Sequence, residues 1–155
     1  DWVCDFIGDT TRDTAHTAAI TRAIEAAGLS ERIHLRGALA PDALAEAYQA
    51  ADLFVLASHY EGYGMVITEA ISQGLPVVTT TGGALADTLP RGAGLAVPPG
   101  DATALAAALS RCLAEPATYN DLAAGAQQAA AGLNDWDAAG QAFADALGLP
   151  ARAGS

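Results

Sequence analysis

Short apolar runs that alternate with alanine-rich helical patterns limit the fold of this chain more than any other feature. The runs predict five strands, at residues 2–7, 33–35, 53–57, 77–79 and 94–97. Parallel strands need a long crossover connection, which is usually a helix, so this alternation is typical of a parallel α/β sheet. We therefore predict an α/β fold, a Rossmann-like parallel sheet with helices on both faces.

Glycine, proline and aspartate mark the ends of the helices that lie between and after these runs. One predicted helix covers residues 13–27 and is closed by Gly28, a second begins at Pro41, and a third covers 64–73 and stops at Gly74. The remaining predicted helices are a short one at residues 84–89, one capped by Asp101, and two at 119–131 and 136–147.

Size and composition predict one ordered domain, residues 1–155. Hydrophobic residues make up 52% of the chain and charged residues 16%, which argues against disorder. The sequence contains no apolar run of the roughly 18 residues that a membrane span needs and no signal-peptide pattern, so we expect no membrane span and a cytoplasmic location. The net charge of −11 repels phosphate backbones, so a nucleic-acid partner is not expected.

The most informative candidate binding motif is the pair Glu61 and Glu69, which follows the predicted strand at 53–57. In open parallel sheets, ligands bind beyond the carboxyl ends of strands, where loops lead into helix N-termini. The amides of Gly64, Met65 and Val66 would open such a helix and favour an anion. Glu61 could accept hydrogen bonds from sugar hydroxyls, and Glu69 from both hydroxyls of a ribose. The pattern favours a nucleotide-sugar over a free metal ion or a nucleic acid.

A series of motifs in this region also points to a family. In chain order they are residues 51–58 (ADLFVLAS), 61–64 (EGYG), 68–70 (TEA), 74–78 (GLPVV) and 94–101 (GLAVPPGD). Together they resemble the donor-binding, C-terminal half of retaining glycosyltransferases of family GT4, which have the GT-B fold. The resemblance covers nearly the whole chain, and two glutamates separated by seven residues within a strand–loop–helix frame are a fairly specific signal.

The resemblance implies a function and a set of site residues. The chain would be the donor-binding domain of a hexosyltransferase, which transfers a sugar from a nucleoside-diphosphate sugar to an acceptor with retention of configuration. Glu61 would be the catalytic residue beside the anomeric carbon, and Glu69 would hold the ribose. The other substrate-binding positions are Gly8 at the diphosphate, Gly37, Ala38 and Leu39 at the base, and Gly62, Tyr63, Gly64, Met65 and Val66 at the sugar and distal phosphate. No metal or other cofactor is implied.

Two parts of the family pattern have no counterpart in this sequence. One is the first strand–helix unit of the donor half, with its phosphate-binding arginine and lysine; the other is the N-terminal acceptor-binding domain. In the strand order 3-2-1-4-5-6 the missing strand is central, so we expect local rearrangement of the sheet or self-association through an unpaired strand edge. We also expect donor binding with negligible transfer by this chain alone, because no acceptor is positioned.

Two further predictions concern a turn and the rival functions. Gly82-Gly83 is expected to form a flexible turn before the short helix. The alternative function is a non-catalytic nucleotide-binding or assembly module on the same scaffold. A nucleotide-sugar epimerase is disfavoured by the spacing around Glu61 and Glu69. The sequence does not identify the base, the sugar or the acceptor.

Overall fold

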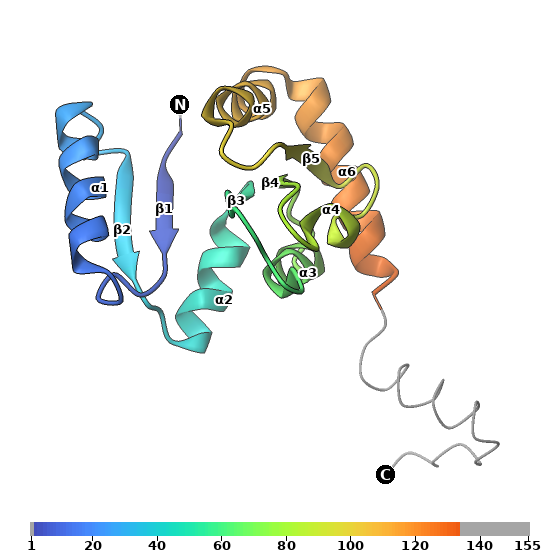
Figure 1. Cartoon of the computed structure of the whole chain (residues 1–155). Coiled ribbons are helices and arrows are strands. Elements are labelled where there is room, and N and C mark those ends of the chain that lie inside the picture. The colour runs from blue at the N-terminus through green and yellow to red at the C-terminus, as the bar shows by residue number, and fades with distance from the viewer. Residues whose placement is uncertain (1, 134–155) are drawn as a thin grey trace, which may run out of the picture. The chain divides into compact units, whose positions relative to one another are not determined.

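The computed structural model describes residues 2–133, in which parallel strands alternate with helices (Figure 1). In chain order the elements are β1 (Cys4–Ile7), α1 (Thr14–Ala26), β2 (Ile33–Gly37), α2 (Pro41–Ala50), β3 (Phe54–Leu56), α3 (Met65–Ser72), β4 (Val77–Thr80), α4 (Leu85–Thr88), β5 (Gly94–Val97), α5 (Ala102–Ala114) and α6 (Pro116–Ala131). The predicted α/β fold is confirmed. The helix predicted at 136–147 lies outside the described residues.

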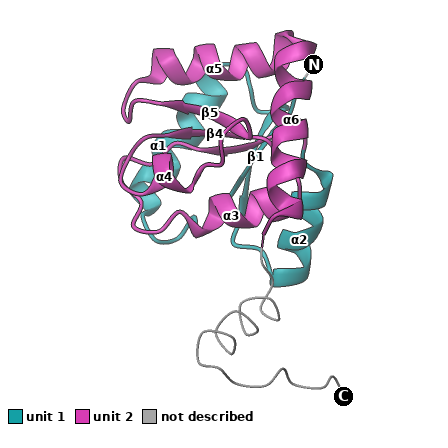
Figure 2. Ribbon diagram, turned by 90° about the vertical axis from the view of Figure 1, so that its right-hand side faces the viewer, with its two compact units in different colours: residues 1–51 teal, residues 52–155 magenta. Residues whose placement is uncertain are grey.

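The chain divides into two compact units, Asp1–Ala51 (unit 1) and Asp52–Ser155 (unit 2), shown in teal and magenta in Figure 2. β1 pairs with β2 in unit 1, and β3, β4 and β5 form the sheet of unit 2 in that order. No described strand joins β1 to β3. Removing strand 1 from the order 3-2-1-4-5-6 leaves these two groups of strands, so the interruption falls where the sequence predicted it. Self-association through the unpaired edge stays a prediction, as does the single domain 1–155.

The predicted helix ends in unit 1 agree with the observed capping contacts. The side chain of Asp13 accepts a hydrogen bond from the N–H of His16 at the start of α1. After the end of α1, Gly28 has a φ of 67°, the left-handed conformation that ends many helices. Pro41 occupies the first turn of α2, where its missing N–H breaks no helical bond.

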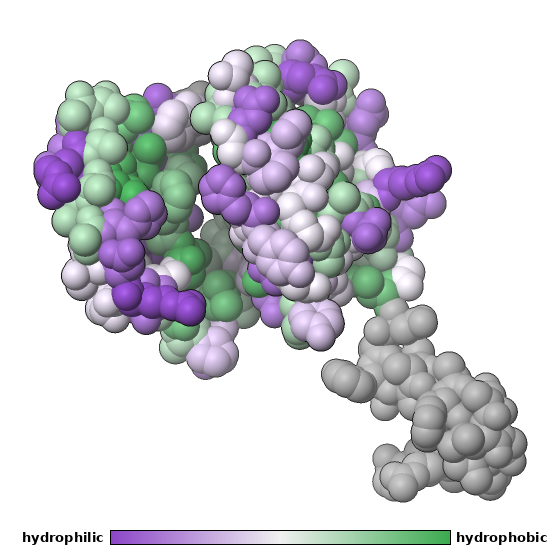
Figure 3. Space-filling model, in the orientation of Figure 1, coloured by the Kyte–Doolittle hydropathy of each residue, from purple (hydrophilic) through white to green (hydrophobic). Residues whose placement is uncertain are grey.

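Unit 1 has little apolar core. None of its described residues is fully buried, and Val3 and Phe6 are 66% and 50% exposed. Green, hydrophobic residues reach the surface of this unit in Figure 3. Polar contacts join its two strands: the Asp5 carboxylate lies 3.0 Å from Nδ1 of His34. Since full burial of a large apolar side chain stabilises a fold by about 1.5–3 kcal/mol, we expect most of the stability to come from unit 2.

The core of unit 2 surrounds β4, all four residues of which are buried. Figure 2 shows α5 and α3 on opposite sides of the strands of this unit. Val78 packs in a cluster with Val97 of β5, Ala108 and Cys112 of α5 and Leu122 of α6. Because side chains alternate along a strand, Val77 faces the other side, where α3 buries Ile67, Ala70 and Ile71. The predicted helices on both faces are therefore present in unit 2.

The last described helix packs directly on backbone through Gly125. α6 begins at Pro116, three residues before the predicted start, with proline in its first turn. A glycine inside a helix costs about 1 kcal/mol relative to alanine. Here a Cβ on Gly125 would overlap the carbonyl of Gly92, which lies in the turn before β5. Gly125 thus lets α6 approach the loop that leads into β5.

This contact predicts that Gly125→Ala destabilises the chain although alanine is the better helix former. Overpacking against the Gly92 carbonyl should lower the free energy of unfolding by about 1–3 kcal/mol. Gly132→Ala at the end of the same helix is the control, because its Cβ would lie 3.5 Å from the nearest atom. Urea unfolding of both variants tests this, and equal stability of the two would contradict the packing argument.

Candidate functional site

The candidate site is built on the loop of residues 58–64, called here the Glu61 loop, which connects β3 to α3. The loop leaves the carboxyl end of a parallel strand and enters the N-terminus of a helix, the position at which open α/β sheets bind ligands. β3 is held in place by β4, with Val55 opposite Val78. The hydroxyl of Thr79 also donates to the carbonyl of Leu56 at 3.0 Å. The sheet therefore fixes the point from which the loop departs.

The Gly82-Gly83 turn packs directly against the Glu61 loop. Glu61 and Gly83 form an isolated parallel bridge, and the N–H of Ala84 donates to the carbonyl of Glu61 at 2.9 Å. A Cβ on Gly82 would overlap the carbonyl of His59, and a Cβ on Gly83 would overlap that of Glu61. The prediction of a flexible turn missed this role. The two glycines are needed because two stretches of backbone meet there without room for side chains.

The Glu61 side chain turns back over its own loop. Its Oε1 accepts a hydrogen bond from the N–H of Gly62 at 3.1 Å and a longer one from the N–H of Tyr63 at 3.5 Å. The residue is half-buried. The carboxylate therefore lies at the entrance to α3, within reach of a ligand bound at the helix start.

The start of α3 presents backbone amides to the outside. Gly64 is buried and adopts the left-handed conformation, with a φ of 67° and a ψ of 24°. Within the part of the chain that the structure describes, the N–H groups of Met65 and Val66 have no hydrogen-bond acceptor. These amides and the positive end of the helix dipole favour an anion at this point, as the sequence predicted.

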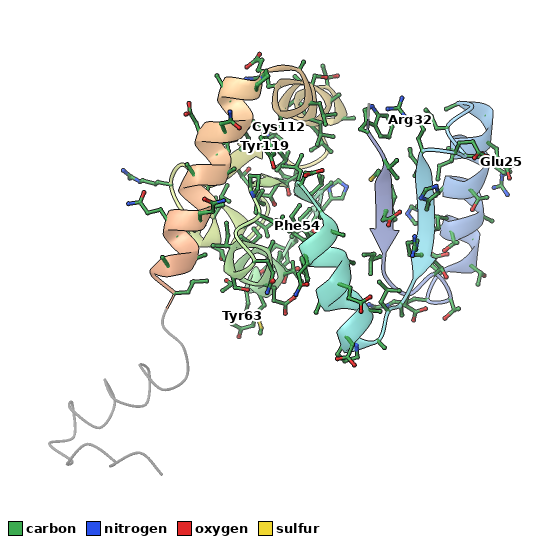
Figure 4. The ribbon with its side chains drawn as sticks, turned by 180° about the vertical axis from the view of Figure 1, so that it is seen from behind. Glu25, Arg32, Phe54, Tyr63, Cys112 and Tyr119 are labelled. Atoms are coloured by element: carbon green, nitrogen blue, oxygen red, sulfur yellow. The ribbon has the colours of Figure 1, made fainter. Side chains whose placement is uncertain are left out.

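Exposed side chains flank this helix start. Tyr63 is 83% exposed and Met65 is 68% exposed. Tyr63 extends outward from unit 2 in Figure 4. Large side chains that stand in solvent here are available to cover a bound ligand, and they contribute little to the core.

Glu69 lies one helical turn further along α3. It is exposed, whereas Ile67, Ala70 and Ile71 of the same helix are buried. Helical spacing puts Glu69 on the same side as Met65, four residues before it. The hydroxyl of Ser72 donates to the backbone carbonyl of Glu69 at 2.7 Å. The structure thus places the two predicted carboxylates on one loop–helix segment of unit 2.

The predicted residues of unit 1 form a group of their own. The N–H of Gly8, after β1, donates to the carbonyl of Gly37, at the end of β2, at 3.0 Å. Ala38 and Leu39 follow directly. A Cβ on Gly8 would meet no atom within 4 Å, so nothing in unit 1 requires a glycine there. The carboxyl ends of β1 and β2 therefore meet at one edge of their sheet.

A small cavity in unit 2 lies beside the Glu61 loop but contains neither glutamate in its lining. Its volume is about 170 Å³, and its lining includes Ala57, His59, Thr80, Pro98 and Leu105. The ring of His59 would lie 3.4 Å from a Cβ on Gly100. His59 thus packs toward the loop before α5, which fits a structural role.

Residues 2–133 contain no group of three histidine, cysteine or acidic side chains arranged to hold a metal ion. Among the same residues, no helix combines the length and the apolar character that crossing a membrane requires.

Comparison with known proteins decides the family. The family model described as Glycosyl transferases group 1 matches residues 1–129. The chain belongs to this family. The resemblance drawn from the sequence motifs is therefore confirmed, and the candidate site lies in a domain of a group 1 glycosyltransferase.

Several named proteins are similar to the chain over part of their length. A D-inositol 3-phosphate glycosyltransferase from Thermomonospora curvata is 36% identical over 112 residues, which is 72% of this chain and 26% of that protein. A sucrose-phosphate synthase from Thermosynechococcus elongatus is 32% identical with a TM-score of 0.74, covering 93% of this chain and 38% of the other. Anabaena HepE in complex with UDP-glucose is 26% identical with a TM-score of 0.80, covering 94% and 40%. The chain thus spans well under half the length of these relatives.

The glycine turn generates a direct prediction. Gly83→Ala should lower the free energy of unfolding by about 2–4 kcal/mol, because it combines overpacking with a left-handed backbone conformation. Gly62→Ala is the control, since its Cβ would meet nothing within 4 Å, and it should change stability by less than about 0.5 kcal/mol. Thermal unfolding followed by circular dichroism measures both. A Gly83→Ala variant as stable as the parent chain would contradict the close approach.

Proposed function

We propose that this chain is the donor-binding domain of a retaining hexosyltransferase that uses a nucleoside-diphosphate sugar. The observation that carries the proposal is the start of α3, where unbonded amides adjoin the Glu61 carboxylate in a group 1 glycosyltransferase. Support comes from Anabaena HepE, a similar structure that holds UDP-glucose. Binding by backbone amides suits a chain with a net charge of −11, because local donors are then the means of attracting phosphate.

The geometry at the helix start fits the charges that develop when a glycosyl phosphate is cleaved. Positive charge grows at the anomeric carbon, and Glu61 would stabilise it from beside the sugar. Negative charge grows on the departing diphosphate, and the amides of Gly64, Met65 and Val66 would stabilise it. Groups that lie within a few residues of each other would thus stabilise both the positive charge at the anomeric carbon and the negative charge on the diphosphate. Glu61 would act through position and charge.

Other predicted residues would hold the remaining parts of the donor. Glu69 would accept hydrogen bonds from the ribose hydroxyls through its exposed carboxylate. Gly8 would line the diphosphate cleft, and the segment 37–39 would read the base. Within unit 1, a Cβ on Gly8 would meet no atom, which supports this role because a ligand can approach the Gly8 backbone closely.

The parent protein would supply the acceptor-binding domain, and the chain alone would bind donor without transferring the sugar. Such transfer requires an acceptor hydroxyl held close to the anomeric carbon and a site from which water is excluded. We further propose that donor binding needs no metal ion and that the protein acts in the cytoplasm. Titration with UDP-glucose in the presence and absence of EDTA tests the metal prediction, and a loss of affinity in EDTA would overturn it.

Calorimetric titration distinguishes a donor-binding domain from the alternative function, a non-catalytic nucleotide-binding or assembly module on the same scaffold. The chain should bind at least one of UDP, GDP and ADP and the corresponding sugar nucleotide. Binding of none of them would overturn the proposed function. Binding of the nucleotides without any added affinity for their sugars would favour the non-catalytic module.

Glu69→Ala should weaken nucleotide binding by about tenfold, or about 1.4 kcal/mol, because the ribose hydroxyls lose their acceptor. Asp121→Ala is the matched control: it removes the same charge from an exposed position on α6. Its affinity should stay within about twofold of the parent chain, since Asp121 is exposed, lies on a different helix from Glu69 and is screened by salt. Equal affinities of the two variants would remove the ribose assignment.

A further inference from the structure

One side chain outside the predicted site reaches the start of α3. Thr88 is the last residue of α4, the short helix that follows the Gly82-Gly83 turn. Its hydroxyl lies 3.2 Å from the carbonyl of Tyr63 and 2.9 Å from that of Ala84. No sequence motif pointed to this residue, and the resemblance assigns no role to it.

The carbonyl of Tyr63 depends on this hydroxyl more than the carbonyl of Ala84 does. A threonine hydroxyl has one hydrogen and donates to one acceptor at a time. Ala84 already accepts from the backbone N–H of Thr88 at 3.0 Å and from that of Asp87 at 3.2 Å. Tyr63, in contrast, has no other donor within the described residues. The Thr88 bond therefore adds a side-chain link between α4 and the Glu61 loop, beside the backbone bond from Ala84 to Glu61.

The same side chain also packs on Gly64. A Cβ built on Gly64 would lie 2.8 Å from Oγ1, 3.0 Å from Cβ and 3.1 Å from Cγ2 of Thr88. The whole threonine side chain therefore lies flush against the residue that begins α3. Gly64 has a left-handed backbone, which glycine adopts without steric cost, so the contact with Thr88 rather than strain restricts this residue. The hydrogen bond from the Thr88 hydroxyl to Tyr63 is the directional part of this contact, and it restricts the direction in which the helix leaves the loop.

We infer that Thr88 is a positioning residue for the distal-phosphate and sugar end of the donor site. It fixes Gly64 and the carbonyl of Tyr63, and so directs the amides of Met65 and Val66 toward the ligand. The inference rests on the proposed function and extends it to a residue on a different element. Core packing of α4 is supplied by Leu85, which is fully buried, whereas Thr88 is only half-buried. The contacts of Thr88 to the loop are thus separable from the stability of the fold.

Two substitutions distinguish the effect of the Thr88 hydroxyl from the effect of the shape of its side chain. Thr88→Val keeps the size and the contact with Gly64 but loses the hydroxyl that donates to Tyr63 or Ala84, whereas Thr88→Ser keeps this donor and loses the methyl. Both variants are compared in the full 155-residue chain, with urea unfolding as a check that the fold persists. The ligand is whichever of UDP-glucose, GDP-mannose and ADP-glucose the parent chain binds best, beside the matching nucleoside monophosphate.

Thr88→Val should weaken binding of the sugar nucleotide by about five- to tenfold, with Thr88→Ser within about twofold of the parent chain. The monophosphate, which lacks the distal phosphate and the sugar, should bind all three proteins alike. Equal losses for both ligands, no loss in Thr88→Val, or no rescue by Thr88→Ser would overturn the inference.

A second measurement decides the role of Thr88 without any ligand. The N–H of Ile67 donates to the carbonyl of Gly64 at 2.9 Å, so its hydrogen exchange reports whether the helix start is fixed. In Thr88→Val this amide should exchange about tenfold faster while the free energy of unfolding is unchanged. Unchanged exchange would show that Thr88 does not hold the helix start. If the parent chain binds no nucleotide, the proposed function fails, but the exchange result still shows whether Thr88 fixes α3.

Discussion

The candidate site depends on one close approach of backbone to backbone, the parallel bridge between Glu61 and Gly83. The loop after β3 carries no regular structure of its own, so an outside contact must hold it. Gly82 and Gly83 provide this contact because neither has a side chain to separate the two stretches of backbone. The position of the Glu61 carboxylate and the start of α3 both follow from this bridge. The candidate site is therefore attached to the sheet through the turn after β4.

Much of this architecture could be predicted from the sequence because local signals and the final fold agree. Asp13 and Gly28 define α1 by capping, and the apolar run at β4 matches a strand covered on both faces. Boundaries were less predictable. β2 extends to Gly37, two residues beyond the predicted strand, and α6 begins at Pro116 rather than at residue 119. The proline was a usable signal for this helix start.

The parts that could not be predicted depend on contacts between segments distant in the sequence. A glycine pair after a buried strand indicates a turn or a close approach equally well, and only the fold shows that Gly83 meets Glu61. Thr88 gives no sequence signal, because threonine near the end of a short helix is unremarkable. Glu61 was predicted to face a ligand, and the structure shows its carboxylate on the amides of Gly62 and Tyr63. Its role toward the sugar stays a prediction.

In the proposed function, the first amides of α3 bind the phosphate next to the sugar. NMR tests this directly by following the amide resonances of the chain while UDP-glucose, GDP-mannose or ADP-glucose is added. We expect the amides of Gly64, Met65 and Val66 to shift most strongly within unit 2, with those of Gly62 and Tyr63 next. Saturable binding that leaves these amides unshifted would contradict the claim.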